Sequence, residues 1–191
     1  LYNQDYMIDK ILIHTCCADC LLNALNFLEE KDFINDDSEV VSLFYNPNIH
    51  PRAEYLERLN AVKKVLPDLK EHWNINIIIP NYSPKEYMSK VLLSNSKNRC
   101  DNCWEVRIKF LFEYAKKENI HYLTTTLLTS HYQEKDRILK IAKDTNKNYN
   151  LEFVELDSSL NETHSGFYKQ NYCGCCFSLT EKMVGSINNL K

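Results

Sequence analysis

The chain has 191 residues, of which 44% are hydrophobic and 26% are charged, so it has the composition of a folded globular protein and not of a disordered one. No stretch approaches the roughly 20 apolar residues of a membrane span, and residues 1–10 lack a basic run followed by an apolar core, so we expect a cytoplasmic protein with no secretory signal and no membrane partner. The net charge is −3, but residues 97–147 hold 11 Lys and Arg against 7 Asp and Glu. This local excess is compatible with binding of a phosphate backbone, but charge alone favours solvated helix faces as its explanation.

Short apolar runs alternate along the chain with segments of helical periodicity. In chain order we predict a strand at 11–15, a helix at 21–30, a strand at 39–45, a loop at 46–51, a helix at 53–66 that ends near Pro67, a strand at 75–80, helices at 84–93 and 104–117, a strand at 121–126, a helix at 134–143, a strand at 151–156 and a last helix near 179–187. The strand runs are continuously apolar, which is typical of a parallel sheet covered by helices on both faces. We therefore predict one α/β domain over residues 1–191, in which residues 165–191 form a cysteine-containing extension that completes the site.

The cysteines are the unusual feature of this composition. Eight of them fall into three tight groups: Cys16, Cys17 and Cys20; Cys100 and Cys103; Cys173, Cys175 and Cys176. Clustered thiols without a secretory signal indicate metal or redox chemistry and not a framework of disulfide staples. The first group follows the first predicted strand, and ligands bind at the carboxyl ends of strands in such folds. The three glycines form no phosphate-binding loop, so the P-loop and dinucleotide motifs are absent.

The spacing of the thiols suits a soft metal, because thiolate is an anionic and polarisable ligand. Cys100 and Cys103 stand at the start of a predicted helix, whose N-terminal dipole favours thiolate over thiol. Gly174 allows a tight turn between Cys173 and Cys175. Eight thiols exceed the four ligands of one zinc ion, and an iron–sulfur cluster takes about four. Spacing leaves iron and zinc both open, although vicinal cysteines favour iron.

Taken together, these motifs resemble the QueH-type epoxyqueuosine reductases. The resemblance rests on His14-Thr15-Cys16-Cys17-Ala18-Asp19-Cys20, Phe44-Tyr45-Asn46-Pro47-Asn48-Ile49-His50-Pro51 with Glu54, Tyr55 and Arg58, Arg99-Cys100-Asp101-Asn102-Cys103-Trp104 with Arg107, Thr124-Thr125-Thr126-Leu127 with Ser130-His131, and Tyr172-Cys173-Gly174-Cys175 with Phe177-Ser178. The motifs occur in the family's order and cover about residues 11–180.

The resemblance implies a Rossmann-like (HUP-type) fold without ATP chemistry. It implies a 4Fe-4S cluster with an additional mononuclear iron beside it, and no cobalamin. The implied reaction removes the epoxide oxygen of epoxyqueuosine at the tRNA wobble position to give queuosine. The implied partners are a tRNA that carries epoxyqueuosine and an external electron donor.

Several ligands follow from the same resemblance. The family's ligand cysteines match Cys16, Cys17, Cys100, Cys103, Cys173 and Cys175, with their division between the cluster and the extra iron left open. Asp19 stands where many members have Pro, so either Asp19 or Cys20 is the third ligand of the extra iron, and we assign Cys20. Cys176 lies outside the family pattern and is expected to be a spectator. A disulfide bond among the thiols is a further expectation.

Loss of an epoxide oxygen as water requires two electrons, two protons and stabilisation of the developing oxyanion. The candidate acids are His14, Asp19, His50, Asp101 and His131, chosen because they lie in or beside the motifs. The candidate contacts to the tRNA are Tyr45, Asn46 and Tyr172 for the base and Arg58, Arg99 and Arg107 for phosphates. Some of these have a structural alternative: His14 as a core residue, the aromatic rings as core rings, and Arg107 paired with a helix acid such as Glu105.

Three other functions compete with the reductase. A zinc-stabilised tRNA-binding module without redox activity uses the same thiols. A thiol–disulfide oxidoreductase uses Cys100 and Cys103 but leaves six other cysteines unexplained. A tRNA thiolase of related fold is disfavoured because the Gly-rich ATP loop is missing.

Overall fold

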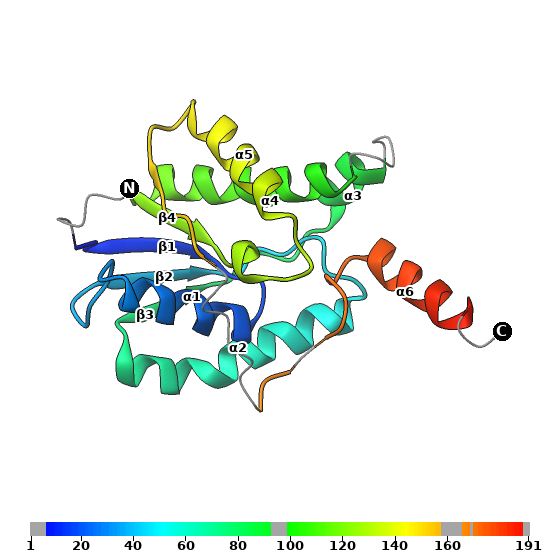
Figure 1. The fold of residues 1–191 in the computed structure, drawn as a ribbon, viewed down its shortest axis with the longest axis horizontal. Helices are drawn as coiled ribbons and strands as arrows, with labels where there is room; N and C mark the ends of the chain where they lie inside the picture. The colour runs from blue at the N-terminus through cyan, green and yellow to red at the C-terminus, as the bar shows by residue number, and fades with distance from the viewer. Residues whose placement is uncertain (1–6, 93–98, 158–165, 169, 189–191) are drawn as a thin grey trace.

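A sheet of five parallel strands forms the centre of the fold (Figure 1). The computed structural model describes residues 7–92, 99–157, 166–168 and 170–188. The strands are β1 (Lys10–His14), β2 (Glu39–Leu43), β3 (Ile75–Ile78), β4 (Tyr122–Thr125) and β5 (Glu152–Phe153), in the order β3-β2-β1-β4-β5. All pairings between neighbours are parallel, which confirms the predicted α/β class.

Helices connect the strands and cover the sheet on both faces. They are α1 (Ala18–Glu30), α2 (Arg52–His72), α3 (Lys85–Leu92), α4 (Arg99–Lys117), α5 (Lys135–Asn146) and α6 (Cys176–Asn188), with a 3-10 turn η2 at Thr126–Thr129. In Figure 1, α1 and α2 lie on one side of the sheet and α4 and α5 on the other. From β1 the chain adds β2 and then β3 on one side of β1, and it then adds β4 and β5 on the other side. Because the crossovers are right-handed, the helices that follow β3 lie on the opposite face of the sheet from those before it.

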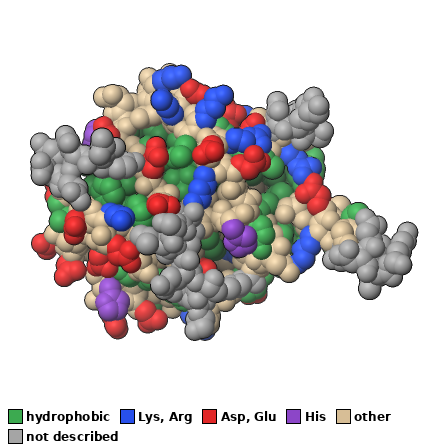
Figure 2. Space-filling model, viewed as in Figure 1, with side chains coloured by type: hydrophobic (Ala, Val, Ile, Leu, Met, Phe, Trp, Pro, Cys, Tyr) green, Lys and Arg blue, Asp and Glu red, His purple; other side chains and the backbone are tan. Residues whose placement is uncertain are grey.

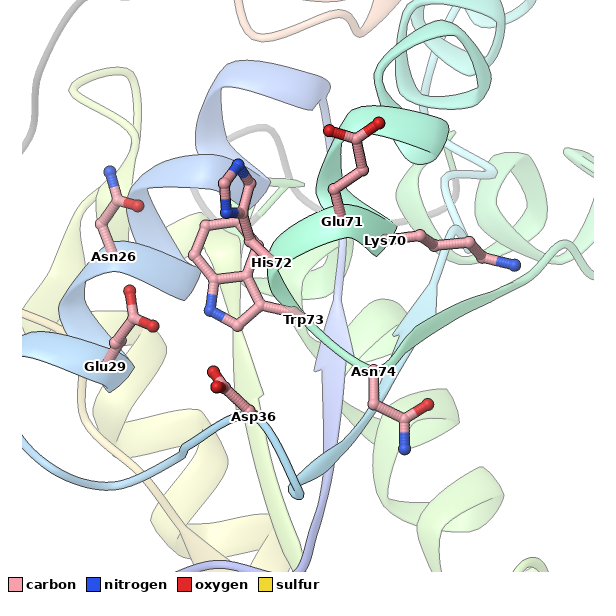
Figure 3. Close-up of a pocket in the computed structure, with 8 residues that line it drawn as sticks. All are labelled: Asn26, Glu29, Asp36, Lys70, Glu71, His72, Trp73 and Asn74. Carbon is pink, nitrogen blue, oxygen red and sulfur yellow. The ribbon is translucent and has the colours of Figure 1, made fainter.

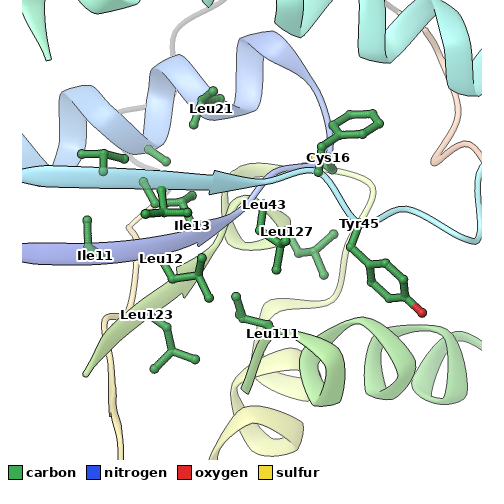
Figure 4. Packing of buried hydrophobic residues seen from close by; sticks show 14 of the residues in the cluster. Ile11, Leu12, Ile13, Cys16, Leu21, Leu43, Tyr45, Leu111, Leu123 and Leu127 are labelled. Atoms are coloured by element: carbon green, nitrogen blue, oxygen red, sulfur yellow. The ribbon is translucent and has the colours of Figure 1, made fainter. Parts of the chain in front are cut away.

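The core explains the continuously apolar strand runs. Leu12 and Ile13 of β1 are completely buried. Figure 4 shows Leu21 of α1 approaching the sheet from one face and Leu111 of α4 approaching it from the other. Successive side chains of a strand point to opposite faces, so a strand with helices on both sides needs an apolar residue at every position.

Most predicted elements appear within a few residues of their expected bounds, and α2 is the main correction. It continues through Pro67 to His72 instead of ending near Pro67. Proline removes one backbone hydrogen bond from a helix. Here the last turn buries Leu69, and the next residue, Trp73, is buried as well. We attribute the continuation to this burial, which offsets the lost hydrogen bond.

The order of strands creates a switch point between β1 and β4. The chain leaves these neighbouring strands in opposite directions, which is where open α/β sheets form a crevice at their carboxyl ends. Cys16 follows β1 and Thr126 follows β4, and the Cys16 N–H donates to the Thr126 hydroxyl at 3.0 Å. The first cysteine group therefore lies at the edge of the sheet where ligands are expected.

The surface shows two further features. In Figures 1 and 2, α6 projects from the rounded body that the other elements form. Over the face in Figure 2, basic and acidic side chains are mixed, with several Lys and Arg in the upper part, where Figure 1 places α4 and α5. Within the described ranges, no helix combines the length and the apolar character needed to cross a bilayer.

Candidate metal centre

The first cysteine group forms a compact and buried set of thiols. The sulfurs of Cys16, Cys17 and Cys20 all lie within 4.8 Å of one another, and no other group of three potential metal ligands of the His, Cys, Asp and Glu types occurs among the residues that the structure describes. Cys17 is the N-cap of α1, and its sulfur accepts a hydrogen bond from the backbone N–H of Cys20 at 3.3 Å. The Thr126 hydroxyl donates to the Cys16 sulfur at 3.2 Å. The turn between β1 and α1 thus gathers the three sulfurs.

This set stabilises one thiolate and disfavours a second. Hydrogen bonds with the Cys17 and Cys20 thiols, aided by the Thr126 hydroxyl, hold the pKa of Cys16 well below its usual range. The same interactions and burial raise the pKa values of Cys17 and Cys20, because a second negative charge would lie next to the first. A soft cation would bind such a set and displace the remaining thiol protons.

The second and third cysteine groups meet in a separate apolar cluster. Cys103 and Cys175 are buried together with Tyr87, and Cys173 packs against them. The Cys173 and Cys175 sulfurs are 3.5 Å apart, and the hydrogen bond from Cys175 lowers the pKa of Cys173 to about 5. Burial raises the pKa of Cys103 to about 11. Cys100 is exposed in the first turn of α4, one turn before Cys103.

A small cavity brings the first thiol group together with one thiol of the third group. It is lined by Cys16, Cys17, Cys20 and Cys173, and further by Asn46, Asn48, Arg58, Arg107, Gln170 and Tyr172 among others. Arg107 faces this cavity and also donates to the Cys103 sulfur at 3.3 Å. Segments that are far apart in the sequence therefore bring their thiols to one place, as the metal hypothesis requires.

Known proteins resemble this chain over most of its length. Residues 11–181 match the family described as epoxyqueuosine reductase QueH. The chain is 32% identical to the epoxyqueuosine reductase QueH of Helicobacter pylori over 88% of its length, 31% identical to that of Thermotoga maritima over 90%, and 29% identical to that of Dehalococcoides mccartyi over 92%. These alignments cover 49%, 91% and 96% of the respective relatives, so the chain spans about half the length of the Helicobacter protein.

The chain belongs to the epoxyqueuosine reductase QueH family. The resemblance inferred from the motifs is confirmed, and with it the prediction of an oxidoreductase. The family match begins in β1 and ends within α6, so it includes every cysteine of the chain.

The C-terminal cysteine segment of this QueH-family chain is held by one buried arginine. Arg58 is 3% exposed and forms an ion pair with Glu54 at 2.7 Å. Its guanidinium also donates to the carbonyl oxygens of Tyr172 and Cys173, each at 3.4 Å. Gly174 has a φ of +102°, and a Cβ there would lie 2.8 Å from the guanidinium. Only glycine suits both the backbone and the close contact.

Arg107 and Arg99 also make polar contacts with other residues of the chain. Arg107 is buried and donates to the carbonyl oxygen and the sulfur of Cys103. Arg99 is ion-paired with Glu181 and lies 5.0 Å from the Phe177 ring, so it links α4 to α6. All three arginines that were candidates for phosphate contacts thus support segments that carry cysteines.

His14 occupies the position of a core histidine. It is completely buried, its Nε2 lies 3.0 Å from the Tyr45 carbonyl oxygen and its Nδ1 lies 2.8 Å from the Thr125 hydroxyl. A carbonyl oxygen only accepts, so Nε2 carries the proton and Nδ1 accepts from the hydroxyl. Burial, aided by Arg107, lowers the pKa of His14 to about 4, so the ring is neutral at physiological pH.

None of the remaining candidate acids lines the cavity. Asp101 pairs with Arg137 at 2.7 Å, and His131 is exposed and stacks on Tyr132 with ring centroids 4.0 Å apart. His50 is half-buried: its Nδ1 lies 3.3 Å from the Tyr82 hydroxyl and its backbone N–H donates to the Gly174 carbonyl oxygen at 2.8 Å. Asp19 lies in the first turn of α1, next to Cys20.

The aromatic candidates are mostly packed inside the protein. Tyr45 is buried and stacks on Phe110 with ring centroids 3.7 Å apart. Tyr172 is buried and donates to the His50 carbonyl oxygen at 3.3 Å. Tyr172 nevertheless lines the cavity, as does Asn46. The structure thus keeps Asn46 and Tyr172 at the site and places Tyr45 in the core beside it.

The expected disulfide bond is not formed. All eight cysteines are free, including the vicinal pair and the Cys173–Cys175 pair. The Cys173 and Cys175 sulfurs are 3.5 Å apart, well beyond the roughly 2.05 Å of a disulfide bond. The thiols are therefore available as ligands.

The cavity residues without a role assigned from the sequence include Asn48 and Gln170. Asn48 belongs to the Asn46–Pro51 motif, and its amide faces the cavity. Gln170 precedes the last cysteine group and lines the same cavity. Asn48 was recognisable as part of a motif, whereas nothing in the sequence distinguishes Gln170 from a surface residue.

A larger hollow of about 700 Å³ lies at the opposite edge of the sheet (Figure 3). It is lined by Asn26, Glu29, Asp36, Lys70, Glu71, His72, Trp73 and Asn74. These residues come from the ends of α1 and α2 and from the loops that enter β2 and β3. The hollow contains no thiol and lies at the amino ends of the strands, away from the edge where such folds bind ligands.

Proposed function

We propose that this chain is an epoxyqueuosine reductase that removes the epoxide oxygen of epoxyqueuosine at the tRNA wobble position and gives queuosine. The observation that carries the proposal is the cavity at the switch point of a QueH-family fold, where thiols from distant segments meet. The strand order and the crevice support the finer assignment to the Rossmann-like HUP type. The substrate partner is a tRNA with epoxyqueuosine, and an external donor supplies the electrons.

The donor set fits a 4Fe-4S cluster with an additional iron. Cys103, Cys173 and Cys175 cluster beside Cys100, which gives the four thiolates that such a cluster needs. Cys16, Cys17 and Cys20 form the second set, and their sulfurs are close enough for one ion. The proposed division places the cluster on Cys100, Cys103, Cys173 and Cys175 and the additional iron on the first group. Residues 165–191 then complete the site as an extension.

When bound, the cluster would relay electrons from the external donor, and the additional iron would act as a Lewis acid for the epoxide oxygen. The chain's own residues prepare their ligands. Thr126 donates a hydrogen bond to Cys16, and Arg107 donates one to Cys103, and both stabilise a thiolate. These thiols are buried, which limits access of water and oxygen to the site.

We assign the proton donor for the leaving oxygen to Asp19. It is the candidate acid nearest in sequence to the first thiol group, in the turn that carries Cys20. His14 has both ring nitrogens engaged within the core, and Asp101 is ion-paired with Arg137. Asp19→Asn should lower kcat without loss of iron. A fall in iron content would instead make Asp19 a ligand.

Anaerobic purification with iron, zinc and acid-labile sulfide analysis tests the metal assignment. The reductase predicts a coloured protein with iron and sulfide, about four of each for the cluster plus one further iron. A colourless protein with stoichiometric zinc would support the alternative of a zinc-stabilised tRNA-binding module. Turnover is tested with a tRNA that carries epoxyqueuosine and a chemical reductant, with queuosine measured in the nucleoside digest.

A further inference from the structure

Three buried amide oxygens at the cavity have no hydrogen-bond partner. Within the described residues, Asn46 Oδ1, Asn48 Oδ1 and Gln170 Oε1 are buried and accept no hydrogen bond, and all three residues line the cavity that holds the thiols. Buried acceptors are nearly always satisfied, because an unpaired one costs about 1–3 kcal/mol. Three in one cavity therefore need donors from a bound molecule, because no donor of the described residues reaches them.

The orientation of one of these amides is fixed by its surroundings. Asn46 is 2% exposed, and its Nδ2 donates to the Thr15 carbonyl oxygen at 2.8 Å. Turning the amide over would place two acceptors against each other, so Oδ1 must be the unpaired atom. Asn48, also 2% exposed, lies two residues further along the same loop. Gln170 comes from the C-terminal segment, so two separate segments supply the acceptors.

The charges around the cavity select the type of donor. Arg58 and Arg107 line it together with the amides, and fixed guanidinium groups disfavour a positively charged donor that no thiolate balances. Neutral hydroxyl groups satisfy the amide oxygens without this repulsion.

We propose that Asn46, Asn48 and Gln170 form the specificity site for the hydroxyl groups of the epoxide-bearing ring on the modified base. This inference rests on the proposed function, because it takes the substrate to be a base with a hydroxylated cyclopentane ring. The amide oxygens hold the ring beside the thiol set and reject bases that lack hydroxyl groups. A site whose polar groups are left unpaired by the wrong ligand discriminates strongly against it.

The test compares binding of two tRNA anticodon stem-loops to the anaerobically prepared holoenzyme. One carries epoxyqueuosine at the wobble position, and the other carries the aminomethyl base without the hydroxylated ring. We expect the wild type to prefer the first by roughly ten- to a hundredfold. Asn48→Leu and Gln170→Leu remove an acceptor at similar side-chain volume and should each lose most of this preference. Asn48→Asp and Gln170→Glu keep an acceptor and should retain it.

Two controls separate the possible outcomes. Asn60→Leu changes an exposed asparagine of α2 and should match the wild type. Iron and sulfide contents should be unchanged in all variants. A fall in iron in Asn48→Leu and Gln170→Leu would show that the oxygens serve the metal and would overturn the inference.

An unchanged preference in both Leu variants would also overturn it. A wild type that reduces the epoxide but binds both stem-loops equally refutes the specificity site alone. A wild type that neither prefers nor reduces the epoxide refutes the proposed function as well.

Discussion

The N-terminal cysteine group and Cys173 of the C-terminal group line the same cavity, but the two groups are held in place by different means. Cys16 and Cys17 follow directly from the central strand β1 and lead into α1. Their positions are set by the sheet, the helix and the bond from Cys16 N–H to Thr126. The C-terminal group has no strand beneath it. Arg58 and the backbone N–H of His50 hold its turn, through the carbonyl oxygens of residues 172–174.

This difference separates a preformed half of the site from an attached half. The preformed half depends on the fold itself, so its thiols should stay together whenever the sheet is intact. The attached half depends on a few side-chain contacts and should respond to single substitutions that leave the sheet unchanged. Substitutions in each half should therefore have different consequences for the thiols.

The largest effect is expected in the preformed half. Cys16→Ser removes the thiol that the set holds most strongly as thiolate, so the additional iron should be lost and activity should fall below detection. The fold should survive, because serine is similar in size and only one buried sulfur is replaced. Iron analysis and the thermal unfolding midpoint of the anaerobic protein measure both effects. Full activity with normal iron content would remove Cys16 from the proposed site.

The next largest effect is expected at Arg58. Arg58→Met leaves the Glu54 carboxylate buried without its partner, which should lower the free energy of unfolding by about 3–5 kcal/mol. It should also increase the alkylation rates of Cys173 and Cys175 in metal-free protein while those of Cys16 and Cys17 stay low. The double variant Glu54→Gln with Arg58→Met restores much of the stability but not the slow alkylation. An equal increase in the alkylation rates of all these thiols would contradict the division into a preformed and an attached half.

A smaller effect of the same kind is expected at Gly174. An alanine there must adopt a φ of +102° and meet the Arg58 guanidinium, so we expect a loss of about 1–3 kcal/mol of stability and a lower sulfide content. Gly185→Ala is the matched control, because its added Cβ meets nothing within 4 Å. That control lies inside α6 and should be neutral or slightly stabilising by about 0.5–1 kcal/mol. The comparison is made by chemical denaturation and sulfide analysis of both variants.

The sequence predicted the preformed half well. The apolar run before Cys16 indicated a buried strand, and the carboxyl end of that strand is the usual ligand edge, so the location of the first thiol group followed from local pattern alone. The helices next to the second and third cysteine groups were also recognisable, although α4 begins at Arg99 and α6 at Cys176, earlier than the predicted starts at 104 and 179. These features are local in the chain.

The sequence did not predict how the attached half is held. The sequence makes Arg58 a candidate for a phosphate contact, whereas the structure buries it in an ion pair with Glu54. Its burial depends on Gly174, which lies more than 100 residues away and leaves space for the guanidinium. The neutral, fully bonded His14 depends in the same way on Thr125 and Tyr45. Such roles arise from tertiary contacts, which a local pattern does not contain.

The smallest effect distinguishes two adjacent cysteines. Cys175 is 9% exposed and packs with Tyr87 and Cys103, whereas Cys176 begins α6 and is only partly buried. Cys176→Ser should keep iron, sulfide and activity, with stability within about 0.5 kcal/mol of the wild type. Cys175→Ser should lose sulfide and activity, because it removes a proposed cluster ligand. Both variants replace one sulfur by oxygen, at adjacent positions. If only Cys175→Ser loses sulfide and activity, the boundary of the site lies between residues 175 and 176. An inactive Cys176→Ser protein with low iron would extend the ligand set into α6.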